Sequence, residues 1–407
     1  MKKIKILAAV MVLAVTAMSL TGCITFDNFK AAFIDKPQDK QAIIQIGIFE
    51  PITGADSVEA EAEIRGIQLA NSVHPNVDGK AIQLVFADNK SDIDAAETAV
   101  QTLIVKQPAV ILGSYQSVYS LAAAPYIEDA KIPAIAITNS NPLVTKNHDF
   151  YFRVCYVDSY QGDILADYVL NQRHEKTAGV LLPSRDEAAQ AMASEFMNRI
   201  KETTGNEDAI LAYEEYKAGT KDFSEQLDII KASRVKTVIL PGEVKDSINI
   251  INQAAEKGMS VQFLGGPEWN EASFAKALND KVKSESLAFV SFFGSEGKVV
   301  EQSESVSEER EKFLKAYSDM YGEDSVPSDA VALGYDAYLV AIDAIGKAHT
   351  ATDGEAIADI LRSPKYSFDG ASGYINFSSI GDPIKTAYIN TWQYGQPTTI
   401  YTYEPVR

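Results

Sequence analysis

One stretch, from Ala109 to Pro142, is the most informative about the fold class of this chain. Its sequence is AVILGSYQSVYSLAAAPYIEDAKIPAIAITNSNP. Residues 109–113 form a continuous apolar run, which is typical of a strand buried on both faces. Ser117 is expected to cap a helix that ends where the chain approaches Pro133. Residues 134–137 are a second apolar strand, and a polar turn follows them. The pattern predicts two parallel strands joined by a helix.

Two turns of this stretch form the first candidate site. Open α/β sheets bind ligands at the carboxyl ends of their strands, and each turn follows such an end. One turn offers the backbone N–H groups of a helix start together with the hydroxyl of Ser117. The other offers the hydroxyls of Thr138 and Ser140. These groups predict an anion site that uses no positive side chain.

The same alternation of strands and helices occupies most of the chain. Apolar runs such as Ile44–Phe49 and Lys80–Asp88 alternate with helical stripes, and the rhythm begins again near Thr177. The predicted fold is α/β, with two doubly wound parallel-sheet lobes joined by a multi-strand hinge. The expected boundaries are 42–157 and 293–364 for lobe 1, and 158–292 and 365–407 for lobe 2.

Residues 1–22 resemble a lipoprotein signal peptide. Lys2, Lys3 and Lys5 precede an apolar stretch that is too short and wrongly flanked for a membrane span. Leu20-Thr21-Gly22-Cys23 resembles a bacterial lipobox, which would make Cys23 the lipidated first residue of the mature protein. Residues 23–41 then form a polar tether. A secreted protein without a lipid is the alternative interpretation.

The composition narrows the classes of function. The formal net charge is −19, and removing residues 1–22 with their three lysines leaves −22, which argues against nucleic acid or an anionic membrane surface as a partner. Cys155 is the only cysteine besides Cys23, so we expect no intramolecular disulfide and a buried thiol. The four histidines lack metal-ligand spacing, and no nucleophile elbow, phosphate loop or C-x-x-C motif occurs. We therefore expect a protein that is not an enzyme and uses no metal or cofactor.

The stretch from Gly113 to Pro142 is similar to the core of the periplasmic branched-chain amino acid (Leu/Ile/Val) binding proteins, which have the type I solute-binding fold and serve ABC importers. The similarity rests on four features of this stretch: a glycine, a serine four residues later, an Ile-Pro pair and a hydroxyl-rich turn. FDGASGYINFSSIGDP near the C-terminus resembles the last hairpin of that family. The resemblance implies that Ser117, Thr138 and Ser140 hold the carboxylate and ammonium groups of an amino acid. It also implies binding roles for Tyr115 and Asp158.

Several pocket positions depart from that family. Its members commonly have Tyr-Gly at the start of the first helix of each lobe, where this sequence has Glu59-Ala60 and Glu187-Ala188. Glu243 falls near a third pocket position, and the turn that usually carries an acid for the ammonium has Glu268 beside Trp269, both of which are expected to contact the ligand. A carboxylate in a closed cleft needs a donor or a positive charge as partner. These glutamates therefore favour a polar or basic amino acid, or a related amine or amide, over leucine or valine; alternatively, some of them face solvent.

Three functions remain open from the sequence. The first is an extracytoplasmic, lipid-anchored monomer that captures an amino acid or similar small zwitterion between its lobes and delivers it to the permease subunits of an ABC importer. A ligand that contacts both lobes selects their closed state, which a partner then recognises. The second is a sensory or regulatory lipoprotein of the same fold without an importer. The third is an enzyme on this fold, which lacks every catalytic motif named above.

Overall fold

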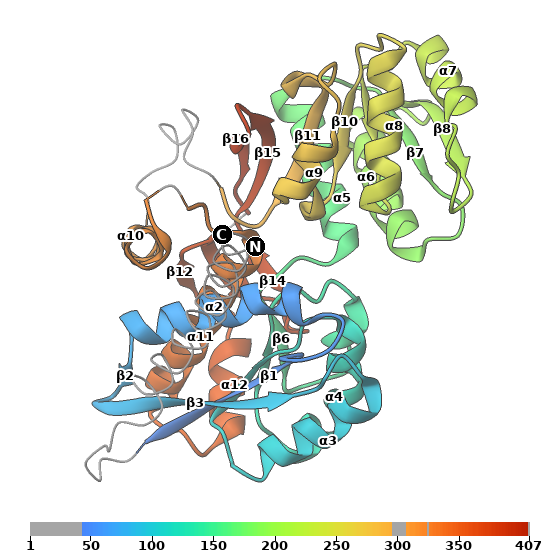
Figure 1. The fold of residues 1–407 in the computed structure, drawn as a ribbon. Coiled ribbons are helices and arrows are strands. Elements are labelled where there is room, and N and C mark those ends of the chain that lie inside the picture. Colours follow the sequence, from blue (N-terminus) through green and yellow to red (C-terminus); the bar gives the residue numbers. More distant parts are fainter. Residues whose placement is uncertain (1–42, 295–306, 324, 406–407) are drawn as a thin grey trace, which may run out of the picture. The chain divides into compact units, whose positions relative to one another are not determined.

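The computed structural model describes residues 43–294, 307–323 and 325–405 (Figure 1). The predicted signal peptide, lipobox and tether lie outside these residues, so lipidation of Cys23 stays a prediction. The described residues form two large sheets and a small third sheet, with helices packed against the large ones.

The first sheet is built from the N-terminal strands. They are β1 (Ile44–Glu50), β2 (Asn76–Val77), β3 (Lys80–Asp88), β4 (Val110–Gly113), β5 (Ala134–Ala136) and β6 (Tyr151–Arg153). Their order is β2-β3-β1-β4-β5-β6, and all neighbours are parallel except β2 and β3. Every residue of β4 and β5 is buried, because helices cover both faces of this parallel sheet.

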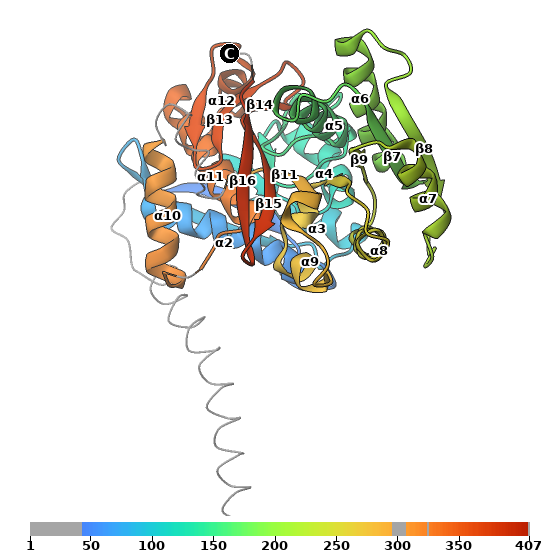
Figure 2. The same cartoon turned by 90° about the horizontal axis from the view of Figure 1, so that it is seen from above.

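Helices pack on both faces of the first sheet. They are α2 (Ser57–Val73), α3 (Ile93–Ile104), α4 (Ser117–Ala130), α10 (Glu308–Tyr321), α11 (Asp329–Ala348) and α12 (Gly354–Arg362). α2 and α11 pack together on one face, and α3 packs beside α4 on the other (Figure 1). A Cβ on Gly66 would lie 2.0 Å from the carbonyl oxygen of Val331, so glycine permits the close approach of α2 and α11. α10 lies against α2 (Figure 2).

The second sheet combines a parallel core with an antiparallel edge. Its strands are β7 (Ala178–Pro183), β8 (Ile210–Tyr216), β9 (Thr237–Ile239), β10 (Gln262–Gly265), β11 (Leu287–Ser291), β15 (Ala387–Gln393) and β16 (Gln396–Tyr403). Their order is β16-β15-β11-β10-β9-β7-β8, and the two C-terminal strands run antiparallel to their neighbours. The accompanying helices are α5 (Asp158–Asp167), α6 (Glu187–Thr204), α7 (Ser224–Ser233), α8 (Val244–Glu256), α9 (Ala272–Ala277) and the short helical turns η2 (Tyr168–Gln172), η3 (Pro267–Asn270) and η4 (Ser284–Ser286). The short turn η1 (Pro142–Val144) lies between β5 and β6 of the first sheet and contacts α4.

The small third sheet packs with the first lobe. It consists of β12 (Phe368–Gly370), β13 (Gly373–Phe377) and β14 (Pro383–Lys385). The N–H groups of Ala371 and Ser372 donate to Asp336 of α11 at 2.7 and 2.8 Å, and the N–H of Arg153 on β6 donates to Gly381 O at 3.1 Å. The sequence had assigned 365–407 to lobe 2. We propose instead that 365–385 belongs to lobe 1, whereas β15 and β16 extend the second sheet.

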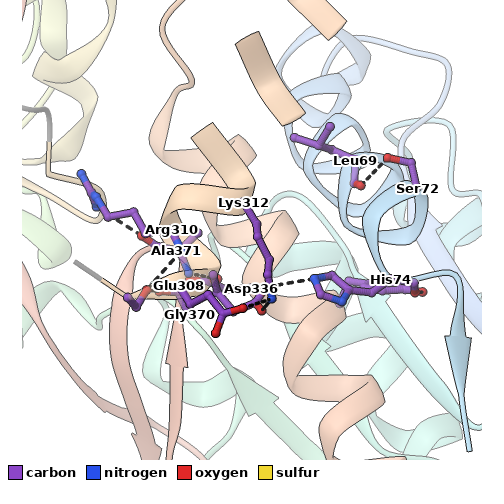
Figure 3. A network of polar contacts seen from close by, with 12 residues as sticks. Leu69, Ser72, His74, Glu308, Arg310, Lys312, Asp336, Gly370 and Ala371 are labelled. Carbon is purple, nitrogen blue, oxygen red and sulfur yellow. Dashed lines mark hydrogen bonds and ion pairs between the residues drawn. The ribbon is translucent and has the colours of Figure 1, made fainter. Parts of the chain in front are cut away.

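Polar contacts also attach α10 to the first lobe (Figure 3). Arg310 donates through Nη1 to Ala371 O at 3.2 Å, next to the Ala371–Asp336 bond. His74, just after α2, lies 2.9 Å from a carboxylate oxygen of Glu309 on α10. These contacts join four segments that are far apart in the sequence.

Candidate functional site

Two turns meet at one edge of the first sheet. β4 and β5 pair in parallel, with Leu112 opposite Ile135, so the turns 114–117 and 138–140 emerge side by side. Ser117 is the first residue of α4 rather than its N-cap, which corrects the sequence prediction. The N-cap is Gln116, in a left-handed conformation with φ 67°. No side chain caps α4, and although the N–H of Tyr119 in its first turn donates to Gln116 O at 3.3 Å, the helix start can offer its other N–H groups to an anionic ligand.

A buried hydrogen-bond network holds the two turns together. The Asn139 amide donates to Ser114 O at 2.7 Å and accepts the Ser120 hydroxyl at 2.6 Å. Ser117 Oγ accepts the N–H of Asn141 at 3.4 Å, which points its hydroxyl toward the second turn. The Thr138 hydroxyl donates to the buried carboxylate of Glu63. The hydroxyl-bearing residues are therefore fixed by the protein before a ligand arrives.

The buried side chain of Arg153 holds the second turn in place through hydrogen bonds. Its side chain is fully buried, and its Nη1 donates to the carbonyl oxygens of Asn139 and Asn141 at 2.6 and 2.9 Å. Its Nη2 donates to Thr145 Oγ1 at 2.8 Å, and its Nε lies 2.7 Å from a carboxylate oxygen of Asp382. A guanidinium matches this arrangement because its five donors spread in one plane.

Ser140 and Asp158 are brought together at the site. The Ser140 hydroxyl donates to the Asp158 carboxylate, which begins α5. Burial raises the pKa of Asp158, although the Ser140 hydrogen bond and Arg153 oppose that rise. Glu268 is reached by solvent, yet desolvation raises its pKa and the charge of Asp158 raises it further. A carboxyl group that is both accessible and desolvated is typical of a recessed position.

Tyr115 joins the same group of acids. Burial raises the pKa of its hydroxyl to about 12, and the charges of Glu63, Glu59, Asp56 and Glu268 contribute in that order. The Tyr115 ring is half-buried, and Glu59 is exposed on the first turn of α2. Sequence reasoning chose Tyr115, Glu59 and Glu268 separately, and the fold brings them into electrostatic contact.

The other predicted acids occupy the starts of second-lobe helices. Glu187 is exposed at the start of α6, and its neighbour Asp186 caps that helix by accepting the Ala189 N–H at 2.9 Å. Glu243 is exposed at the N-cap of α8. Burial raises the pKa of Tyr216, and the charges of Asp246, Asp186 and Glu243 raise it further. Asp186 also raises the pKa of Asp158, so it links this group to the first site.

Trp269 has a structural position. Its side chain is 1% exposed and stacks on Phe274, with ring centroids 4.9 Å apart. Its carbonyl oxygen accepts the indole N–H of Trp392 at 2.8 Å. The sequence prediction that its ring lines the site is therefore corrected: the ring packs inside the second lobe and anchors the turn that carries Glu268.

Sequence reasoning missed four buried polar residues that position the site. They are Glu50, Glu63, Asn139 and Arg153, all at most 1% exposed. A signal existed for Glu63, because it lies on the buried stripe of α2 with Ala60 and Ile67, at helical spacing. A carboxylate on an apolar stripe is unusual and indicates a partner within the fold.

Residues 43–396 match the periplasmic binding protein family. The chain belongs to this family. The resemblance drawn from the sequence is confirmed, as is the α/β fold with two sheet-based lobes. Membership implies an extracytoplasmic location and a binding role rather than a catalytic one. Within the described ranges, none of the helices is long and apolar enough to cross a membrane.

Relatives of this periplasmic binding protein include amino acid binding proteins. A Leu/Ile/Val-binding protein homologue of Brucella abortus is 23% identical over 87% of this chain and 92% of its own length. An amino acid binding protein of Pseudomonas aeruginosa is 27% identical, but the match covers 55% of this chain and 60% of that relative.

Solved structures give the same picture. A leucine-binding protein from Thermotoga maritima has a TM-score of 0.71 and 28% identity, covering 89% of this chain and 99% of its own. A branched-chain amino acid transporter substrate-binding protein from Streptococcus pneumoniae, in complex with isoleucine, has a TM-score of 0.69 and 26% identity, covering 90% of this chain and 99% of its own.

Proposed function

We propose that this protein captures an amino acid or similar small zwitterion between its lobes and delivers it to the permease of an ABC importer. The pairing of opposite charges at one sheet edge supports this proposal. The uncapped start of α4 suits a carboxylate, and the Ser140–Asp158 pair beside it suits an ammonium group. Ser117, Thr138 and Ser140 are the side chains that we assign to the head group.

The proposal includes a membrane anchor at Cys23. A lipid there would hold a monomeric binding protein at the outer face of the membrane that carries the permease, and residues 23–41 would act as the tether. Family membership supports the extracytoplasmic location and the importer, and the lipobox of the sequence supports the anchor.

The acidic surroundings favour a polar or basic ligand. Asp158, Glu268 and Tyr115 share one electrostatic environment, and Asp186 connects it to Glu243 and Asp246. Arg153 is the cation that acts on Asp158, and it is already paired with Asp382. Carboxylates that are partly desolvated need cationic or donor partners. An arginine, lysine, ornithine or glutamine side chain would supply them, whereas leucine or valine would not.

A thermal-shift panel of amino acids tests this function. The protein is first unfolded and refolded to remove any ligand acquired during expression. A ligand at about 1,000 times its Kd stabilises by roughly 4 kcal/mol, which gives a clear shift. We expect shifts with polar or basic amino acids that disappear in Asp158→Asn and persist in Thr203→Ala, an exposed control on α6. If leucine, isoleucine or valine gives the largest shift, the ligand class is wrong; if no amino acid or related amine shifts the protein, the proposed function fails.

A further inference from the structure

Two carboxyl groups lie in contact beneath the candidate site. Glu50 is the last residue of β1, and Glu63 lies near the middle of α2. Both are fully buried. The charge of Glu63 raises the pKa of Glu50, so the two groups interact, and one buried oxygen of each, Glu50 Oε1 and Glu63 Oε2, has no hydrogen-bond donor in the described part of the chain. A proton shared between the two carboxyl groups would satisfy both oxygens, because carboxylate oxygens only accept. Burying two ionised carboxylates side by side would be far more costly than keeping one proton between them.

Each carboxyl group also holds one turn of the site. Glu50 Oε2 accepts the backbone N–H of Tyr115 at 2.6 Å. Glu63 Oε1 accepts the hydroxyl of Thr138. Within the described residues, Glu50 Oε1 and Glu63 Oε2 receive no hydrogen bond from any third group. The pair therefore links the turn after β4 with the turn after β5.

The nearest charged and titratable groups do not pair a cation with either carboxyl group, although Arg153 and Lys385 act on Cys155, which lies near Glu63. Tyr115 faces Glu63 from the turn after β4, and Glu59 and Asp56 lie near the same tyrosine hydroxyl from the start of α2. From β6 and the residues after it, Tyr151 faces Glu50 and the thiol of Cys155 faces Glu63. α11 approaches Glu63 through Gly334, whose added Cβ would lie 2.3 Å from the Glu63 carbonyl oxygen. In the described part of the chain, neither Glu50 nor Glu63 forms an ion pair with Lys, Arg or His, so a proton is what compensates the pair.

We propose that Glu50 and Glu63 are positioning residues of the ligand site, and that the proton they share keeps both turns in the binding arrangement. This inference rests on the proposed function. Loss of the proton places two negative charges together in a buried space and drives the carboxyl groups apart. Tyr115 and Thr138 then move with them, and ligand affinity falls. Burial and the neighbouring carboxylate raise the pKa of Glu50 well above its usual value, so the proton is held to a higher pH than on an ordinary glutamate and is lost as the pH rises further.

Glu50→Gln is the decisive variant. The amide oxygen can still accept the Tyr115 N–H, and the amide N–H can donate permanently to Glu63. Calorimetry from pH 5.5 to 9.5, with the ligand found in the panel, should show wild-type affinity falling about tenfold per pH unit above the pKa of the pair. Glu50→Gln should match wild type at pH 5.5 and keep its affinity as the pH rises. Titration of the ligand itself cancels in this comparison, because both proteins bind the same ligand.

Two further variants complete the test. Glu63→Gln places the fixed amide on the other side of the pair and should also flatten the profile, which covers the case in which Glu50→Gln does not fold. Glu202→Gln, an exposed glutamate on α6, should keep the wild-type profile. A wild-type affinity that does not change with pH, or parallel profiles for wild type and the folded pair variants, would overturn the inference.

A measurement without ligand separates this inference from the proposed function. In the infrared spectrum at pH 7, the carbonyl band of protonated carboxyl groups should be weaker in Glu50→Gln than in wild type or Glu202→Gln. The pKa of the pair is higher in the folded state than in the unfolded state, so the folded protein binds the shared proton more tightly. The free energy of unfolding therefore falls as the pH rises from the unfolded-state pKa to the folded-state pKa. Glu50→Gln should lose less stability over the same range. An unchanged carbonyl band overturns the shared proton even if no ligand is found.

Discussion

Replacing Arg153 with methionine should loosen the turn that carries Thr138 and Ser140. Methionine keeps much of the volume of the stem but removes every donor. The carbonyl oxygens of Asn139 and Asn141 lose charged donors at 2.6 and 2.9 Å, and Asp382 loses a cation at 2.7 Å. These acceptors are part of the fold in the absence of ligand, so the effect on stability does not depend on the identity of the ligand.

The structure sets the expected size of this effect. Removing one partner of a buried ion pair typically costs about 3–5 kcal/mol. Asp382 keeps 20% of its side-chain surface exposed and also accepts the Thr145 hydroxyl at 2.7 Å, so water and Thr145 partly compensate it. Asn139 O keeps a weak donor, the Cys155 thiol at 3.1 Å. We therefore expect a loss near the lower limit, about 3 kcal/mol.

Urea denaturation of four variants and the wild-type protein measures this loss. Arg153→Met is compared with Asp382→Asn, with the double variant and with Arg199→Met. Arg199 is the matched control, because its side chain is 43% exposed and its carboxylate partners lie 3.5 and 3.9 Å away. Exposed pairs contribute at most about 1 kcal/mol. The double variant should cost less than the sum of the two single variants, because their interaction is lost once. If Arg153→Met costs no more than Arg199→Met, the bracing role of Arg153 is refuted.

Further predictions concern the site, the anchor and the core. Ser140→Ala and Ser117→Ala should each weaken ligand binding by about tenfold to a hundredfold in calorimetry, since hydrogen bonds to charged groups contribute about 1.5–3 kcal/mol; unchanged affinity in both removes them from the site. Cys23→Ser should abolish labelling by radioactive palmitate and leave uncleaved or released protein, and persistent labelling contradicts the lipobox. Burial raises the pKa of the Cys155 thiol to about 12, so it should resist thiol reagents at pH 8 until the protein unfolds, and rapid reaction of folded protein opposes this.

The regular elements could be predicted because local pattern and tertiary environment agree. Lys80–Asp88 was expected as a strand and forms β3 with those bounds, and Ile44–Phe49 lies within β1. The helix expected to start at Glu187 is α6, and Glu187 is its first residue. In each case, an apolar period of one type is bounded by residues that favour turns.

The placement of the tail and of Trp269 depended on packing that local pattern does not contain. Residues 368–385 alternate like any small hairpin, and long-range contacts, such as their bonds to Asp336 and Arg153, attach them to the first lobe. Trp269 was expected at the ligand because it follows Glu268. A large aromatic residue in a turn can face solvent or the core. The Trp269 ring stacks on Phe274 and therefore lies in the core of the second lobe.

Some residues of the candidate site could be predicted from the order of strands and helices alone. Ser117, Thr138 and Ser140 follow strand ends, where topology alone brings side chains together. Glu50 and Glu63 are separated by a turn and half a helix, and their contact depends on how α2 packs over the sheet. The sequence shows each as one acid among many, so the pairing could be found only from coordinates.

Asp329 connects these features of the site with the crossing between the lobes. It lies at the start of α11 on the first lobe, and its carboxylate accepts the N–H groups of Phe292 and Phe293, each at 3.1 Å, just after β11. It also accepts the side-chain amide of Asn270 at 3.1 Å, in the turn that carries Glu268. One buried carboxylate at the start of α11 therefore holds both the end of β11 in the second sheet and the turn that carries Glu268. A ligand that shifts Glu268 would act on this carboxylate through Asn270, which gives the second lobe a direct physical route to α11.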